Sequence, residues 1–310
     1  MLDQIVTAQL PIRAPRRTVG LAMSAVVIAV ALFVFWPSGE GASPQAARAL
    51  RRAAEVARSQ PALPAPTQEE YLYTRIQNSE TSIYVAGSGQ SSFSFITSTE
   101  VESWIAPDGS GRVLSDPIGV GFPTTEDESA WQSAGSPNLK EPPSDKELDE
   151  GGPTPDLAGV PTAPDELLKA IERREIIDGD DTDLVTFEII GELLHLSYGS
   201  PRHRAALFEA AADFAGVDFE GSVTDPTGRP GVSVSFDGDG QRHELIIDPA
   251  TSELLAERRT VLDPQKAGVD VPPDARPATI IDSAGPPETV VLWRLYLDTA
   301  VVDSIDPRSD

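Results

Sequence analysis

The sequence predicts an α+β protein with an N-terminal transmembrane helix and one extracytoplasmic domain built on an antiparallel sheet. Three observations support this fold class: an uncharged apolar run near the N-terminus, two groups of segments with alternating apolar and polar residues, and about three amphipathic helices between those groups. The order of strands, helices and strands lacks the βαβ alternation of a doubly wound fold. Neither G-x-x-x-x-G-K-[ST] nor G-x-G-x-x-G occurs, so we predict no nucleotide cofactor.

The apolar run, TVGLAMSAVVIAVALFVFW at 18–36, is uncharged and long enough to cross a hydrocarbon layer of about 30 Å as a helix. Three arginines precede it and a tryptophan ends it, which favours a short cytoplasmic tail at 1–17 and a single-pass protein of the cell membrane whose remainder is extracytoplasmic. A cleaved secretory signal is the alternative. The run is longer than the usual core of such a signal and has no clear A-x-A cleavage site.

Composition excludes several classes of function. The 310-residue chain has a formal net charge of -25, and most of this charge follows the basic tail, so its surface repels the phosphates of nucleic acids. There is no cysteine, which excludes disulfides, iron–sulfur clusters and thiolate zinc sites. We therefore predict no nucleic-acid partner, and a domain that is held together by its core alone.

The segment 37–66 combines a short helix with a proline-rich spacer. Small apolar residues recur there at helical spacing: Ala46, Ala49, Leu50, Ala53, Ala54 and Ala57. Prolines 61, 64 and 66 then end the helix and stiffen the chain. Two interpretations remain open. The helix either docks on the domain or on a second copy of itself, or it is a solvated stalk.

The extracytoplasmic domain is predicted at 67–310. Alternation begins at YLYTRIQN and recurs in SSFSFITSTEVESWIAPDGSGRV, where Asp108 and Gly109 mark a turn between antiparallel strands. The following segment, 115–161, is rich in Pro, Gly, Asp, Glu and Ser and poor in apolar residues. It is predicted to be a long mobile acidic loop, which is either disordered or covers a cleft.

Three helices and five strands are predicted after this loop. The helices begin near Asp165, at DLVTFEIIGELLHLS, and at Pro201, and the last one ends before Gly216. Each has one apolar face, so we expect the three to pack against a sheet. The strands are predicted at 217–224, 231–236, 241–248, 253–262 and within ETVVLWRLYLDTAVV, which follows a proline-rich loop at 263–287. The last strand is apolar on both faces near its centre, as in an interior strand.

Catalytic motifs are absent from the sequence. His195, His203 and His243 are the three histidines, and they show no metal-ligand spacing. Neither G-x-S-x-G nor S-x-x-K occurs. We predict that the protein is not an enzyme. An envelope hydrolase is the weaker alternative, and it would require carboxylates clustered with one of the histidines in a deep pocket.

The segment FDGDGQRHELIIDPATSELL invites a calcium-loop interpretation. Numbered from Asp237, the loop has Asp239 at position three and Asp248 at position twelve, but Arg242 occupies position six, where an EF-hand needs glycine. Asp-Gly between alternating apolar runs instead favours hairpin turns. We therefore predict no metal site at this segment. The hairpin tip is expected to be exposed, and the following strand to point Leu245 and Ile247 into the core.

Four segments of the chain show a family pattern: SPRHRAALFEAAADFAGVDFEGSVTDPTGRPGVSVSF, HELIIDPATSELLAERR, ALRRAAEVARSQPA and WIAPDGSGR. They resemble an uncharacterised family of actinobacterial membrane-anchored proteins that are often encoded near extracytoplasmic-function sigma factors. The resemblance covers most of 45–262. These motifs are structural, so the resemblance carries over no catalytic residue.

Strands that end in W-x-x-P-D-G at 104–109 are followed by a helical segment and then by strands with L-x-x-D-P-x-T at 245–251. More distantly, this order is similar to the periplasmic lipoprotein-carrier and sigma-regulator fold, a half-barrel-like open sheet with helices on its concave face. This resemblance implies that a hydrophobic ligand, such as a lipid or lipoprotein, or a partner protein binds in the cleft. Seven residues are candidates for lining that cleft: Phe187, Ile190, Leu194, Leu207, Phe208, Trp293 and Leu295. We therefore expect a membrane-anchored binding or sensor protein linked to envelope signalling. A structural or interaction protein without a small ligand is the alternative.

Overall fold

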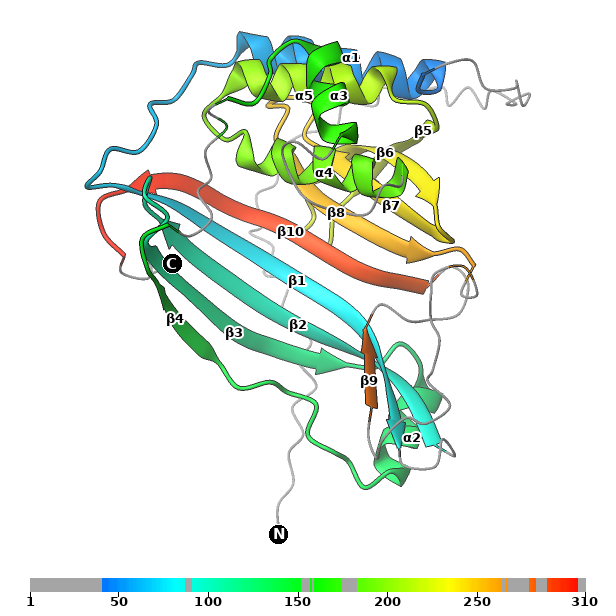
Figure 1. Ribbon diagram of the computed structural model, residues 1–310. Coiled ribbons are helices and arrows are strands. Elements are labelled where there is room, and N and C mark those ends of the chain that lie inside the picture. Colours follow the sequence, from blue (N-terminus) through cyan, green and yellow to red (C-terminus); the bar gives the residue numbers. More distant parts are fainter. Residues whose placement is uncertain are drawn as a thin grey trace, which may run out of the picture. The chain divides into compact units, whose positions relative to one another are not determined.

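The computed structural model describes the greater part of the chain after residue 40 (Figure 1). The described residues are 41–86, 91–151, 157, 159–173, 183–263, 266, 279–282 and 289–305. The predicted transmembrane segment at 18–36 lies outside them. Among the helices that are described, none is both long enough and apolar enough to span a membrane.

The described strands form one open antiparallel sheet, which confirms the α+β class. The strands are β1 (Tyr71–Ala86), β2 (Ser91–Ile105), β3 (Gly111–Gly121), β4 (Ser144–Leu148), β5 (Val217–Thr224), β6 (Pro230–Gly238), β7 (Gln241–Ile247), β8 (Leu254–Val261), β9 (Thr279–Asp282) and β10 (Thr289–Val302). Their order is β4-β3-β2-β1-β10-β8-β7-β6-β5, and β9 pairs with β1 beside this path. The last long strand, β10, is interior as predicted, because it lies between β1 and β8.

Four of the five described helices lie over one half of the sheet. The helices are α1 (Pro44–Ser59), α2 (Thr125–Ser133), α3 (Pro164–Glu172), α4 (Asp183–Leu196) and α5 (Pro201–Asp213). The last three confirm the predicted helices. In Figure 1, α1, α3, α4 and α5 lie above β5 to β8, with α4 directly against β6, β7 and β8, while α2 lies at the far end of β2. The sheet therefore carries four helices on this face rather than three.

The fourth helix is α1, which decides between the two interpretations of 37–66. It packs against α5, and its buried residues belong to the main hydrophobic core. Ser43 caps its N-terminus, where Ala46 N donates to Ser43 Oγ at 3.4 Å. The helix docks on the domain and is not a solvated stalk, so the packed unit begins before residue 67.

The predicted acidic loop at 115–161 contains regular structure, so that prediction is wrong. The end of β3, all of α2 and all of β4 fall within it. Both new elements form without an apolar face. Thr124 caps α2, three acidic residues occupy its first turn, and none of its residues is buried. The strand β4 pairs with β3 through its backbone, while its side chains stay largely exposed.

The hairpin prediction at β6 and β7 is confirmed. The two-residue turn consists of Asp239 (φ 51°) and Gly240 (φ 75°), the left-handed pair that a type I′ turn requires. Leu245 and Ile247 are buried in the core, while Asp237 is exposed and accepts hydrogen bonds of 2.7 and 2.8 Å from Arg242. Within the described part of the chain, no group of three acidic or histidine residues is placed to hold a metal ion.

Candidate functional site

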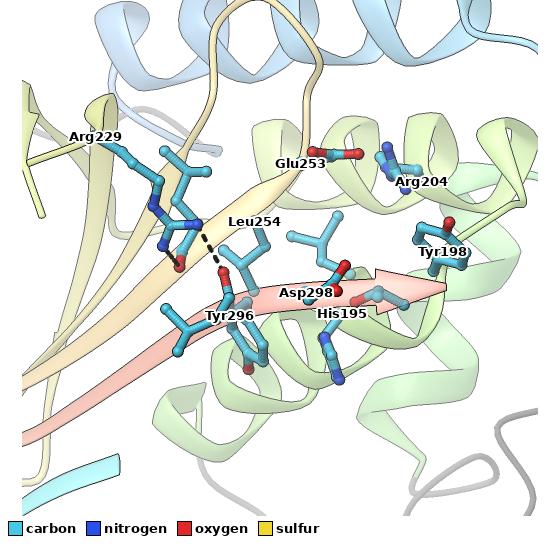
Figure 2. A pocket seen from close by; sticks show the side chains of 12 residues that line it. His195, Tyr198, Arg204, Arg229, Glu253, Leu254, Tyr296 and Asp298 are labelled. Atoms are coloured by element: carbon cyan, nitrogen blue, oxygen red, sulfur yellow. Dashed lines mark hydrogen bonds between the residues drawn. The ribbon is translucent and has the colours of Figure 1, made fainter. Parts of the chain in front are cut away.

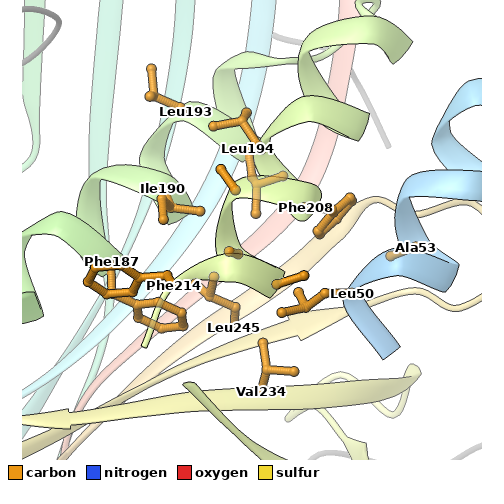
Figure 3. Packing of buried hydrophobic residues seen from close by; sticks show 14 of the residues in the cluster. Leu50, Ala53, Phe187, Ile190, Leu193, Leu194, Phe208, Phe214, Val234 and Leu245 are labelled. Carbon is orange, nitrogen blue, oxygen red and sulfur yellow. The ribbon is translucent and has the colours of Figure 1, made fainter. Parts of the chain in front are cut away.

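The predicted cleft between helices and sheet is filled by the side chains that were expected to line it. Phe187, Ile190, Leu194, Leu207 and Phe208 are each at most 3% exposed and pack together in the main core (Figure 3). Trp293 and Leu295 instead belong to a second cluster, with Ile246, Leu255 and Ala256. Alternation along β10 turns Tyr296 toward the helices and Leu295 to the opposite face. The seven residues therefore do not line a common cleft.

A pocket of about 290 Å³ lies where the end of α4 and the start of α5 meet β8 and β10 (Figure 2). It is lined by Leu194, His195, Tyr198, Arg204, Arg229, Glu253, Leu254, Leu255, Tyr296, Leu297, Asp298 and Thr299. Leu194 is the one residue of the predicted set that reaches it. The pocket combines leucine side chains with several charged groups, so its lining offers both apolar and charged contacts.

Arg204 is the charged group that distinguishes this pocket. It lies in the first turn of α5 on the same stripe as Leu207, Phe208 and Ala211, so the helix carries it inward. The residue is 8% exposed. Its Nε donates to Ser197 Oγ at 3.4 Å, and the described residues offer its guanidinium no other hydrogen bond or ion pair. Burial lowers the pKa of Arg204, although an arginine remains charged at neutral pH.

Arg229, the second arginine of the pocket, is fully engaged. Its Nε donates to Asp225 Oδ2 at 2.7 Å, and its two terminal nitrogens donate to the carbonyl oxygens of Tyr296 (2.7 Å) and Leu255 (2.9 Å). Figure 2 shows the two bonds to the carbonyls. Arg229 therefore joins β8 to β10 and fixes one wall of the pocket. Its charge is not available to a ligand.

Two carboxylates accompany Arg204 at the pocket. Glu253 is exposed at the start of β8, and its side chain makes no hydrogen bond or ion pair with any described residue. Burial has the larger effect on the pKa of Arg204 and lowers it, while the nearby carboxylate of Glu253 acts to raise it. The two side chains nevertheless form no ion pair. Asp298 is half-buried on β10. Among the described residues, the pocket thus holds one cation with incomplete pairing, Arg204, and one carboxylate without a side-chain hydrogen bond or ion pair, Glu253.

The inner wall of the pocket connects to a buried polar network. Tyr296 lines the pocket, and its hydroxyl donates to Glu257 Oε1. Glu257 Oε2 lies 2.8 Å from His243 Nε2. His243 Nδ1 lies 3.6 Å from Glu188 Oε1, which is an electrostatic contact rather than a hydrogen bond. Glu188 in turn accepts a hydrogen bond of 2.5 Å from Arg259.

The pKa shifts in this network follow from its pairing. Burial alone would raise the pKa of Glu257, but His243 outweighs it and brings the pKa to about 2. Burial alone would lower the pKa of His243, but Glu188 and Glu257 raise it above its usual value. His195, which stacks on Tyr296 at 4.2 Å, has its pKa lowered to about 4 by burial. His195 is therefore neutral at pH 7, whereas the raised pKa of His243 favours its protonated form.

The two histidines near the pocket lack, among the described residues, the surroundings that an acid–base catalyst needs. The His243–Glu257 pair resembles an acid–base pair, but His243 is 1% exposed and lies under the edge of Phe187, away from the pocket. His195 does line the pocket, but no described residue orients its ring by a hydrogen bond, and its low pKa makes it a weak base. The pocket therefore brings a histidine and carboxylates together without the contacts that a general base needs.

Comparison with protein-family models and with curated proteins finds no match for this chain.

Sequence reasoning missed the charged residues that matter most, although a signal was present. Arg204 precedes Leu207, Phe208 and Ala211 by three, four and seven residues, so it occupies the apolar stripe of its helix. His243 shares the inward parity of Leu245 on β7. A charged or polar residue at a core position is the pattern that would have identified both.

Proposed function

We propose that this chain is a single-pass, membrane-anchored extracytoplasmic binding or sensor protein that holds a small ligand in the pocket around Arg204. The uncharged run at 18–36 and the arginines before it support the anchor and its orientation. Arg204 carries the binding proposal. A buried guanidinium with a single long hydrogen bond is unfavourable in the free protein, and an anionic ligand group would compensate it.

The surroundings of Arg204 suit a preformed site. The bonds of Arg229 hold β8 and β10 together, and Ser197 Oγ, which contacts Arg204, donates to the carbonyl oxygen of Leu194 at 2.6 Å. A rigid pocket reduces the entropy lost on binding. The expected lining residues on α4 and α5 pack into the core instead of bordering a cleft, which disfavours the lipid or lipoprotein suggested by the half-barrel resemblance. We therefore propose a ligand smaller than a lipid, and a partner protein that transmits the signal.

The test is native mass spectrometry of the full-length chain, purified from membranes in mild detergent. Wild type is compared with Arg204→Gln and with the control Arg202→Gln, an exposed residue two positions away that does not line the pocket. We expect a small-molecule adduct on wild type and on the control, and its loss from Arg204→Gln. An adduct that persists in Arg204→Gln, or the absence of any adduct from all three proteins, would contradict the proposal.

A structural or interaction protein without a small ligand is the second candidate. The observation that favours it is the filled interface between the helices and the sheet. It predicts that cross-linking in membranes captures a stoichiometric protein partner, and that this capture is the same in wild type and Arg204→Gln. A binding protein whose ligand regulates the partner would instead lose or gain cross-links in the variant.

A further inference from the structure

We infer that the ligand of this pocket is a small zwitterion of the amino-acid type, with its carboxylate on Arg204, its ammonium group toward Glu253 and Asp298, and its apolar part on the leucines. The inference rests on the proposed function and specifies the chemistry of the same site. It follows from three features of the pocket: the signs of its charges, its apolar wall, and its size.

The charges favour a ligand that carries both signs. Arg204 and Glu253 both line the pocket and influence each other electrostatically, yet they form no ion pair. Arg229 is already satisfied by Asp225 and two carbonyl oxygens, so Arg204 is the cation of the pocket that a ligand can pair with. A carboxylate placed at Arg204 brings an adjacent ammonium group within the field of the acidic side chains.

Ligands of a single charge sign fit less well. A simple anion such as phosphate would gain Arg204, but it would face Glu253 and Asp298 in a protein whose formal net charge is -25. A simple cation would be repelled by the buried positive charge of Arg204. A neutral apolar molecule would leave Arg204 buried without a partner, which is costly.

The remaining wall and the volume set the size of the ligand. Leu194, Leu254, Leu255 and Leu297 line the pocket beside its charged groups. The volume of about 290 Å³ is at the small end of ligand pockets, which range from about 300 to 1,000 Å³. A compact zwitterion with one aliphatic or aromatic side chain fits these limits better than a lipid or a nucleotide.

The experiment is isothermal titration of the full-length protein in detergent, after extensive dialysis, with the twenty standard free amino acids. Each one that binds is compared with two analogues, the acid without the amino group and the amine without the carboxylate; for L-leucine these are 4-methylpentanoate and 3-methylbutylamine. We expect at least one amino acid to bind, and both of its analogues to bind at least about tenfold more weakly, the loss that an unmatched charged group produces.

Two variants assign the two ends of the ligand. Arg204→Gln should weaken binding of the amino acid at least about tenfold, and Arg202→Gln should leave it unchanged. Glu253→Gln should weaken binding of the amino acid, because it removes the attraction between Glu253 and the ammonium group. It should not weaken binding of the acid analogue, which has no ammonium group and is only repelled by Glu253.

The outcomes separate this inference from the proposed function. If an acid analogue binds as tightly as its amino acid and still depends on Arg204, the zwitterion inference fails and the proposed function stands. The inference also fails if Glu253→Gln does not weaken the amino acid. If no amino acid binds while native mass spectrometry shows an Arg204-dependent adduct, the inference again fails alone. If neither experiment finds a ligand, both fail.

Discussion

The two arginines of the pocket differ in how the protein pairs them. Arg229 has three short hydrogen bonds to one carboxylate and two carbonyl oxygens, so its burial is compensated and its role is structural. Within the described part of the chain, Arg204 has one side-chain hydrogen bond, of 3.4 Å. Buried charges are normally paired, because removing an unpaired charge from water is costly. The incomplete pairing of Arg204 is therefore the residue-scale observation on which the functional proposal depends.

Replacement of Arg204 by methionine should separate stability from binding. Because the guanidinium is desolvated and poorly paired, an apolar side chain of similar length should stabilise the ligand-free protein by about 1 kcal/mol. Binding should be lost in the same variant. Urea unfolding of the dialysed full-length protein measures the first effect and titration measures the second. A variant that is destabilised by several kcal/mol would show that Arg204 has a structural partner.

The His243–Glu257 pair predicts a pH dependence of stability with two limbs. The pKa of His243 is raised, so the folded protein retains a proton that the unfolded chain releases above about pH 6.5. Stability therefore falls as pH rises from about 6.5 through the raised pKa. The pKa of Glu257 is lowered to about 2, so its contribution is present above about pH 4.5 and is lost as pH falls toward 2.

His195 adds to the acid limb of this profile. Its pKa is lowered to about 4, so between about pH 6.5 and 4 the unfolded chain binds a proton that the folded protein does not. Stability therefore falls through this range as pH falls. His243→Gln should abolish the loss above pH 6.5 and, because it leaves Glu257 without its buried partner, destabilise by about 3 kcal/mol. His203→Gln, outside this network, should keep the wild-type slope. Equal slopes in all three proteins would refute the assignment to His243.

At the scale of elements, periodicity predicted the strands and helices that bury a face and missed those that do not. The helix α4 and the hairpin of β6 and β7 were predictable because each places apolar residues at the spacing of its structure. The edge strand β4 and the helix α2 bury almost nothing, so backbone pairing and capping determine them, and composition alone suggested a loop.

The pocket was less predictable than the fold for a related reason. Its residues come from the end of α4, the start of α5, and the strands β8 and β10, which are distant in sequence. Apolar patterning identified the faces that pack, so it selected core residues such as Phe187 as the cleft lining. It also placed Trp293 and Leu295 on the helix side, but the face of β10 that carries them lies away from the helices.

Gly191 sets the distance between α4 and the sheet. A Cβ at this position would lie 2.9 Å from Leu245 Cδ2, so only glycine allows this approach without adjustment. Gly191→Leu should therefore lower the free energy of unfolding by about 1–3 kcal/mol. It should also weaken ligand binding, since α4 carries Leu194 and His195 to the pocket. Glu192→Leu, at the exposed neighbouring position, should change stability by less than about 0.5 kcal/mol. Similar urea midpoints for the two variants would show that the close approach is not needed.

At the scale of the whole molecule, the absence of cysteine makes the membrane topology directly testable. Ser59 is an exposed residue at the end of α1, and Thr7 belongs to the predicted cytoplasmic tail. In intact cells, a membrane-impermeant thiol reagent should label Ser59→Cys and leave Thr7→Cys unlabelled. After the membrane is permeabilised, the reagent should label Thr7→Cys as well. The reverse pattern, or equal labelling of both variants in intact cells, would contradict the proposed orientation.

The central claim is that Arg204 binds an acidic group of a small ligand. The most direct measurement is a crystal structure of the protein purified with its native ligand. We expect density for a compact molecule in the pocket, with an oxygen at about 2.7–3.2 Å from a terminal nitrogen of Arg204. A pocket that holds only ordered water, with Arg204 paired to Glu253, would contradict it.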